Sequence, residues 1–175
     1  LYLSYSESFL PKSGEQYKSW GDEAAFDPDI FENTELGFKY DLDNGVSLSV
    51  AYFDAEMKAG QEDGTGGSEV MEMEISGFEI GVKGQIDEQN SINFGLTSVD
   101  ANKADGKEKP KEVPELTYSA WYTHQANDLF AISLGLIYQD EQIVKSEGGA
   151  VLPDFTRLDM AMAITPTETD TIRIN

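Results

Sequence analysis

The fold is decided by residues 35–52, ELGFKYDLDNGVSLSVAY. Leu36, Phe38 and Tyr40 alternate with charged or small residues, and Val46 then begins a second run in which every other residue is apolar. Alternation with a period of two places one apolar row on one face of a β-strand. Asn44 and Gly45 separate the two runs, and both residue types tolerate the positive φ that a tight hairpin turn requires. The stretch therefore predicts a β-hairpin with one apolar face.

The same period recurs along most of the chain, and helical spacing is almost absent. Further alternating runs lie at residues 1–9, 78–86, 92–97, 116–125, 129–142 and 158–164. Tight connections are expected at residues 43–45, 87–90, 126–128 and 166–170, and long polar connections at 10–30, 57–73, 101–115 and 143–153. We therefore predict an all-β fold, an antiparallel meander of about nine strands with less than about one tenth helix.

The connections alternate strictly between long and short, which places every long loop at one end of the sheet. Outer-membrane β-barrels have this arrangement, and runs of about 9 to 14 residues suit tilted strands that cross a bilayer. Charged strand residues also avoid the apolar rows, as lipid contact requires. The apolar row is expected on the outer surface at Leu36, Phe38, Tyr40, Val82, Ile132, Leu134 and Met160. The opposite surface is expected to carry Lys39, Lys83, Ser133 and Asp159, and the parity of Trp121 places it there too.

Composition excludes several classes of protein. The 33 acidic and 12 basic residues leave a net charge of −21, which would repel nucleic-acid phosphate, so no nucleic-acid partner is expected. The absence of cysteine removes disulfides, thiolate metal sites and cysteine nucleophiles. No apolar run is long enough for a membrane-spanning helix. A membrane-spanning β-strand is shorter and does not require such a run.

Three segments resemble the barrel strands of TonB-dependent siderophore receptors. They are the run LYLSYSESF at residues 1–9, the run ENTELGFK at residues 32–39 after Asp27-Pro28-Asp29, and LPDFTRLD at residues 152–159. Their order and spacing agree with the family across nearly all 175 residues. The resemblance implies that residues 1–175 are a partial transmembrane β-barrel domain, part of a 22-stranded barrel whose plug domain and remaining strands lie outside this chain.

The resemblance also implies the function and the partners. The chain would belong to an outer-membrane receptor that takes up a ferric siderophore, with energy from the TonB complex acting through the missing plug, and outer-membrane lipid would cover the apolar row. Transport of this kind requires no enzyme activity and no cofactor. The truncated strand at each end is consistent with an excerpt of a longer protein.

The candidate ligand-binding residues are aromatic side chains in a long polar loop, Tyr17, Trp20 and Phe26. A large aromatic residue is seldom left in a polar loop without a contact, and self-packing of the loop is the other reading. His124, the single histidine, reads as a hydrogen-bonded imidazole near a turn, so no catalytic residue is expected. No metal-ligand spacing is present, and Asp63-Gly64-Thr65-Gly66-Gly67 lacks the ordered acidic positions of a calcium loop.

One alternative fits the length of the chain. It is a small self-contained eight-stranded barrel, either a structural protein of the outer membrane or a soluble lipocalin-like ligand binder. The two readings differ at the edges of the sheet, because a closed barrel leaves no unpaired edge strand. In the excerpt, residues 1–9 and 171–175 are expected to present unpaired backbone and not to pair with each other.

Overall fold

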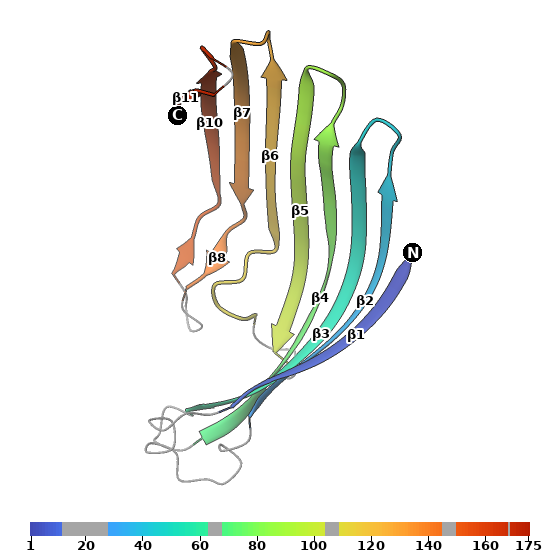
Figure 1. The fold of residues 1–175 in the computed structure, drawn as a ribbon. Coiled ribbons are helices and arrows are strands. Elements are labelled where there is room, and N and C mark those ends of the chain that lie inside the picture. The colour runs from blue at the N-terminus through green and yellow to red at the C-terminus, as the bar shows by residue number, and fades with distance from the viewer. Residues whose placement is uncertain (12–27, 63–67, 104–108, 145–149, 168) are drawn as a thin grey trace.

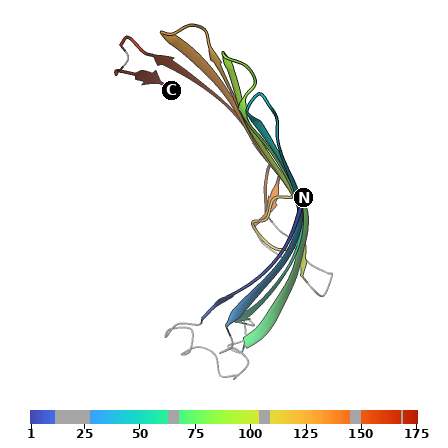
Figure 2. The same ribbon diagram turned by 45° about the vertical axis from the view of Figure 1, so that its right-hand side comes forward.

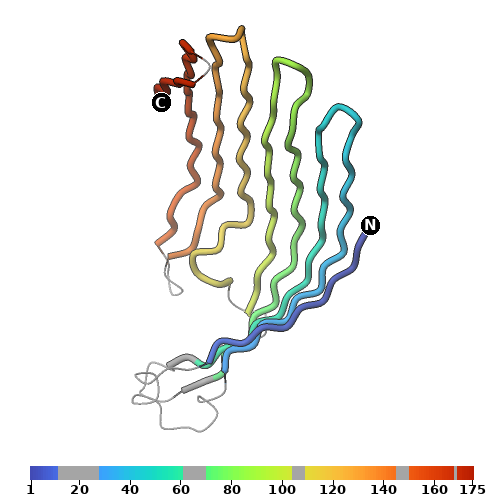
Figure 3. Tube along the Cα trace, viewed as in Figure 1, coloured from blue at the N-terminus to red at the C-terminus, as the bar shows by residue number. Residues whose placement is uncertain are grey.

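The computed structural model describes residues 1–11, 28–62, 68–103, 109–144, 150–167 and 169–175 (Figures 1 and 3). All of its regular elements are β-strands, which confirms the predicted all-β class for the described residues. The strands are β1 (Tyr2–Leu10), β2 (Asp29–Asp41), β3 (Val46–Glu62), β4 (Ser68–Gln85), β5 (Asn90–Lys103), β6 (Leu116–Gln125), β7 (Phe130–Gln139), β8 (Gln142–Ile143), β9 (Val151–Leu152), β10 (Phe155–Ile164) and β11 (Ile172–Ile174).

Nine strands form one antiparallel sheet in the order β1-β2-β3-β4-β5-β6-β7-β10-β11. Each of these strands therefore pairs with the strand of the sheet that follows it along the chain. The short β8 and β9 pair separately. Figure 2 shows that the sheet is strongly curved, with β1 and β11 on its two edges. In the described part of the chain these edge strands do not pair with each other, as predicted, and the meander does not close into a small barrel.

Register assigns every strand residue to one of two faces, since residues directly opposite each other in an antiparallel pair point the same way. We call the face with the even-numbered residues of β2 to β7, β10 and β11 the even face, and the opposite face the odd face; in β1 the parity is reversed. Tyr40, Leu48, Val82, Phe94, Ala120 and Leu136 form one continuous even-face row. The two predicted residue sets therefore share faces as expected.

The two ends of the sheet differ. At the turn end, strands β2 and β3, β4 and β5, β6 and β7 are joined by tight connections, the first of them around Asn44-Gly45. Gly45 has a φ of 88°, which the hairpin turn requires, and its amide donates to the Leu42 carbonyl at 3.0 Å. At the opposite loop end lie the connections that were predicted to be long.

Two of these connections are shorter than predicted. Residues 57–73 were expected to form a polar loop, but β3 continues to Glu62 and β4 begins at Ser68. Likewise β5 continues to Lys103. The prediction was wrong because the alternation persists with reversed polarity: Met57 and Ala59 now lie on the odd face, with Glu56 and Lys58 on the even face. The backbone hydrogen bonds between the strands do not depend on which face of the sheet is polar.

A single curved layer leaves little interior. The buried hydrophobic residues among those described are Ala51, Ala101 and Ala131, and no large side chain is fully buried. Within the described ranges, no helix is long and apolar enough to cross a membrane. Both faces of the sheet are therefore surfaces, and the chemistry of each face decides what it contacts.

Candidate functional site

The even face is apolar over the half of the sheet nearest the turn end. Leu134 is 54% exposed, Met160 68% and Leu158 77%, values unusual for large apolar side chains in one continuous region. Tyr118 and Tyr138 lie directly opposite each other on this face, with ring centroids 4.8 Å apart. These exposed side chains form one continuous apolar area, which requires an apolar environment to cover it.

We call this exposed apolar region of the even face the apolar band, and tyrosine hydroxyls lie at both of its margins. Tyr122 donates to the Asn90 side chain beside the turn end, where His124 Nδ1 also lies 2.9 Å from Asn90 Oδ1. Toward the loop end, Tyr138 donates to Asp140 Oδ1 at 3.3 Å. An apolar ring with its hydroxyl in a polar margin is the arrangement that an aromatic girdle at a membrane interface requires.

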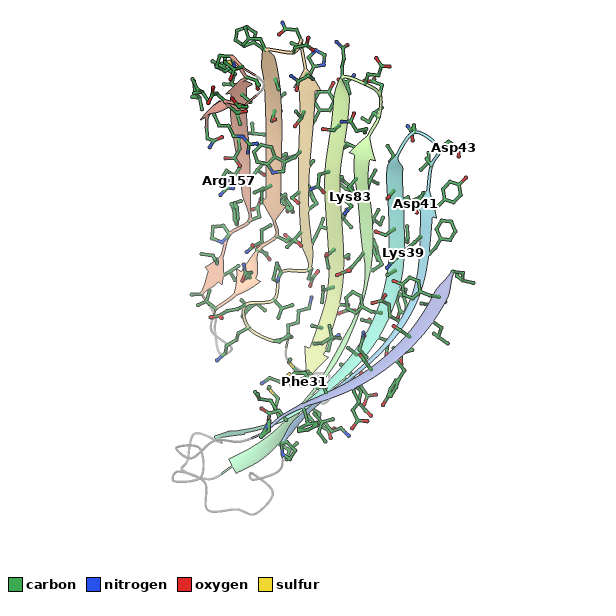
Figure 4. All side chains as sticks on the ribbon, in the orientation of Figure 1. Phe31, Lys39, Asp41, Asp43, Lys83 and Arg157 are labelled. Carbon is green, nitrogen blue, oxygen red and sulfur yellow. The ribbon has the colours of Figure 1, made fainter. Side chains whose placement is uncertain are left out.

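The odd face of the same half is polar. Arg157 Nε donates to Asp159 Oδ2 at 2.9 Å, and Thr123 Oγ1 lies 2.8 Å from Ser133 Oγ. Lys39 Nζ lies 5.0 Å from the centre of the Tyr2 ring. Figure 4 labels Lys39 on β2, Lys83 on β4 and Arg157 on β10. The odd face of this half of the sheet is therefore suited to contact with water.

Aromatic rings on the odd face lie over glycines. A Cβ on Gly135 would be 2.7 Å from the Trp121 ring, and one on Gly37 would be 2.1 Å from the Tyr2 ring. The rings thus occupy space that any larger residue at these positions would need. Trp121 lies on the predicted face, where its ring lies over Gly135 of the neighbouring strand.

The polarity of the two faces reverses toward the loop end. On the even face, Glu7, Glu32, Glu56 and Glu74 of four successive strands lie directly opposite one another. The adjacent row contains Asp54 and Asp100. A row of carboxylates cannot lie in hydrocarbon, so the apolar band ends before it.

The odd face becomes apolar over the same rows. Met57 lies directly opposite Met73, and Phe53 opposite Gly77, where a Cβ would be 2.7 Å from the Phe53 ring. Ile75 lies directly opposite Ala101. We call this region the apolar wall; it comprises Phe53, Met57, Met71, Met73, Ile75, Val99 and Ala101.

The segment Lys109–Glu115 lies at the edge of the apolar wall, beside the part of β5 that β6 does not reach. Two backbone hydrogen bonds hold it: Val99 N donates to the Glu115 carbonyl at 2.8 Å, and Glu112 N to the Ile143 carbonyl at 2.9 Å. Pro110 is buried. The Lys109 ammonium pairs with Glu115, which raises the pKa of Lys109 above its ordinary value.

A cavity of 390 Å³ lies where this segment meets the wall. It is lined by Met71, Met73, Lys103, Lys109, Pro110, Lys111 and Val113. A neighbouring cavity of 190 Å³ has Val99, Ala101, Val113 and Ile143 among its lining residues. Both lie at the loop end, so the sheet has a hollow with lysines and thioethers at the same end as its longer connections.

The predicted ligand contacts Tyr17, Trp20 and Phe26 lie outside the described residues, and so do residues 63–67. His124 lies beside the tight turn, next to Asn90, as its sequence position suggested. In the part of the chain that the structure describes, no group of three or more His, Cys, Asp or Glu side chains could hold a metal ion.

The lysines and methionines of the cavity were not among the predicted site residues. One signal was available in the sequence: Met71 and Met73 continue the alternation of Ile75 and Gly77 without a break. The proximity of Lys109 and Lys111 to these methionines carries no such signal, because it depends on how a connection folds back over the sheet.

Comparison with known families gives one match over the whole chain. The family model described as TonB dependent receptor-like, beta-barrel, covers residues 1–175. A probable TonB-dependent siderophore receptor, PiuA of Acinetobacter baumannii, is 27% identical over 93% of the chain and 25% of its own length. The catecholate siderophore receptor Fiu of Escherichia coli K12 is 27% identical over 89% of the chain and 23% of its own length.

Solved structures agree on the fold. The closed form of the ferric-catecholate import receptor Fiu from E. coli K12 superposes with a TM-score of 0.82 at 21% identity, over 98% of this chain and 27% of that one. The chain spans about a quarter of the length of the curated relatives it matches.

Proposed function

Since the chain belongs to the TonB-dependent receptor-like β-barrel family, a family of receptors and transporters and not of enzymes, we propose that it forms part of the wall of an outer-membrane receptor that takes up a ferric siderophore. Residues 1–175 would be one portion of the barrel domain. The plug and the remaining strands would be supplied by the rest of the receptor, and β1 and β11 would pair with neighbouring strands there.

The observation that carries the proposal is the opposite polarity of the two faces of one sheet. Near the turn end, the exposed apolar even face would contact lipid, while the odd face with Arg157 and Asp159 would face the water-filled lumen. Toward the loop end, the carboxylate row would stand in water outside the membrane and the apolar wall would line the mouth of the barrel.

Strand lengths support this placement. About 9 to 11 residues suffice to cross a bilayer at the usual tilt. Strand β3 has 17 residues and β4 has 18, so both would extend beyond the membrane. Their loop ends would carry the apolar wall to where a ligand arrives from outside the cell.

The relatives support the proposed ligand and the proposed energy source. PiuA and Fiu carry the names of siderophore receptors, and a ferric siderophore is the proposed ligand here. The TonB complex would act through the plug. Tyr17, Trp20 and Phe26, which lie between β1 and β2 in the sequence, remain the proposed ligand contacts, since aromatic rings would suit bulky chelates.

Growth under iron limitation tests this function. Deletion of the gene should abolish growth on one class of ferric siderophore and spare growth on ferrous iron, and loss of TonB should reproduce that defect. Growth of the deletion strain on every siderophore that the parent strain uses would contradict the proposal.

The small eight-stranded barrel is not favoured. A closed barrel would pair its first and last strands, whereas β1 and β11 of the described sheet lie on opposite edges. The match to a receptor-barrel family over residues 1–175 points the same way.

A further inference from the structure

We propose that the turn-end margin of the apolar band contains a phospholipid headgroup site, in which His124 donates a hydrogen bond from Nε2 to the lipid phosphate. The inference rests on the proposed function, because lipid has to cover the apolar band, and it specifies which lipid group this margin binds. The phosphate belongs to a phospholipid of the periplasmic leaflet, since the tight turns of outer-membrane barrels face the periplasm.

His124 lies where the apolar band ends. It follows Tyr122 on the even face of β6, and the residues directly opposite it are Asn90 of β5 and Ile132 of β7. Ile132 is an apolar residue that is 44% exposed, whereas Asn90 comes directly after a tight turn. A side chain at this boundary reaches the layer of lipid headgroups, as the hydroxyl of an interfacial tyrosine does.

The hydrogen bonds around Asn90 determine which imidazole nitrogen of His124 carries a proton. The Asn90 amide nitrogen donates to Asp87 Oδ1 at 2.7 Å and to Oδ2 at 2.8 Å, and an ionised carboxylate only accepts. The carbonyl oxygen of the Asn90 side chain is therefore the atom that faces β6. It accepts a hydrogen bond from the Tyr122 hydroxyl, and His124 Nδ1, at 2.9 Å, donates to it as well.

With Nδ1 donating to Asn90, the second ring nitrogen of His124 is left for a partner outside the chain. Within the described ranges, Nε2 has no hydrogen-bond partner. In a neutral imidazole this nitrogen is an acceptor, whereas in an imidazolium it carries a second proton, taken from water, and donates to an anion. Imidazole side chains in general gain that proton between about pH 5 and 8.

A lipid phosphate at this margin has one cationic partner in the part of the chain that the structure describes. The turns at residues 87–89 and 126–129 contain no lysine or arginine, and Lys83 of β4 lies on the odd face. A hydrogen bond between two ionised groups is about twice as strong as one between neutral groups. The phosphate contact is therefore assigned to His124.

The other ionisable groups beside His124 decide the class of headgroup. They are the acids Asp87, Glu88 and Asp128 of the two adjoining turns, together with the Tyr122 phenol. Carboxylates repel an anionic headgroup and attract an ammonium group. An ethanolamine headgroup suits both features, since its ammonium lies beside the acidic turns while its phosphate accepts from His124.

The test uses the full receptor and compares urea unfolding in bilayers that contain phosphatidylethanolamine with unfolding in micelles of a maltoside, which has no phosphate. At about pH 6, His124→Gln should lower the folded-to-unfolded ratio in the bilayers by roughly threefold to tenfold more than in the micelles. This excess should vanish at about pH 8, because a histidine that gains an anionic partner on folding loses that stabilisation as the pH rises. Inorganic phosphate added to the micelles should not reproduce the excess.

Tyr122→Phe is the matched control, because it removes the other hydrogen bond to the Asn90 side-chain oxygen and leaves His124 Nε2 in place. Its cost should be the same at the two pH values. A bilayer excess for His124→Gln that does not depend on pH, or one that Tyr122→Phe reproduces at both pH values, would overturn the inference.

Nuclear magnetic resonance of the wild-type receptor tests the contact without reference to stability. In the receptor labelled with isotopic nitrogen in histidine, polarisation should pass from Nε2 of His124 to the phosphorus of the bilayer at the lower pH, and His124→Gln should remove this signal. Absence of the transfer in a receptor that inserts and takes up its ferric siderophore would overturn the inference and leave the proposed function intact. A receptor whose apolar band does not contact lipid would contradict both.

Discussion

Glu56 of β3 lies directly opposite Glu74 of β4 on the even face, and the odd-face neighbours of these two residues, Met57 and Met73, also lie directly opposite each other. One pair of strands thus presents two carboxylates to one side and two thioethers to the other. Like charges in direct opposition destabilise a sheet. The arrangement is intelligible if the carboxylates face water above the lipid and the thioethers face the barrel mouth.

Replacement of Glu56 by lysine should stabilise the sheet, because the new ammonium would lie between the carboxylates of Glu32 and Glu74. The expected gain in the free energy of unfolding is about 0.2 to 1 kcal/mol for each new cross-strand pair, and it should shrink as salt is added. Urea unfolding of the receptor in detergent measures it. Glu88→Lys, in the turn after β4, makes the same charge change without a cross-strand carboxylate, and an equal gain there would attribute the effect to net charge alone.

Leu134→Arg should impair insertion into a bilayer, whereas Ser133→Arg should be tolerated. The two residues are adjacent on β7, but Leu134 lies on the exposed apolar even face and Ser133 on the polar odd face. An arginine in the lipid-facing middle of a barrel strand costs about 2 to 4 kcal/mol. The resistance of the folded barrel to denaturation by detergent at room temperature reports insertion. Equal tolerance of both arginines would show that β7 does not face lipid.

Gly84→Ala should destabilise the barrel more than Gly45→Ala. Both glycines have positive φ, 141° at Gly84 and 88° at Gly45, which alanine adopts only with strain. A Cβ at Gly84 would also lie 2.2 Å from the Gly45 carbonyl oxygen, whereas one at Gly45 meets nothing within 4 Å. The expected cost at Gly45 is about 1 kcal/mol, with a larger one at Gly84. Unfolding free energies in the reverse order would contradict the close approach of Gly84 in β4 to the turn at Gly45.

The turn after β4 should contribute stability that depends on pH. Asp87 Oδ1 accepts hydrogen bonds from the backbone amides of Gln89 and Asn90, both at 2.9 Å, and its carboxylate also accepts from the Asn90 side chain. These contacts, the Asn90 side chain foremost, lower the pKa of Asp87 below its ordinary value of 3.8.

A lowered pKa means that the contribution of Asp87 is fully present above the ordinary pKa and is lost as the pH falls through the folded value. The difference in unfolding free energy between wild type and Asp87→Asn should therefore be constant above about pH 5 and shrink below about pH 4. Unfolding measured across this range tests it. A difference that grew on acidification would have the wrong sign.

The hairpin and the register were accessible from the sequence because they depend on local pattern. The alternation of Leu36, Phe38 and Tyr40, with Asn44-Gly45 after it, predicts the β2–β3 hairpin and which side chains share a face. The prediction of a loop at residues 57–73 was wrong because β3 and β4 both keep a period of two within that range, although their charged residues there lie on the even face.

The cavity was not accessible in the same way. Met73 of β4 and Lys111 of the later connection line the same cavity because the segment Lys109–Glu115 folds back over the sheet, where hydrogen bonds to Val99 and Ile143 hold it. No local pattern in the sequence predicts this placement. The predicted ligand contacts Tyr17, Trp20 and Phe26 lie outside the described residues and stay predictions.

The environment of the two faces can be measured directly with spin labels on introduced cysteines, since the chain contains no cysteine of its own. The informative positions are Leu134→Cys on the apolar band, Ser133→Cys on the polar odd face and Glu56→Cys in the carboxylate row. In the receptor reconstituted in liposomes, the label at 134 should collide with lipid-soluble oxygen and be shielded from a water-soluble nickel complex. The labels at 133 and 56 should show the reverse preference. Equal accessibility at 133 and 134, or a lipid-exposed label at 56, would contradict a sheet that spans the outer membrane and emerges from it before the carboxylate row.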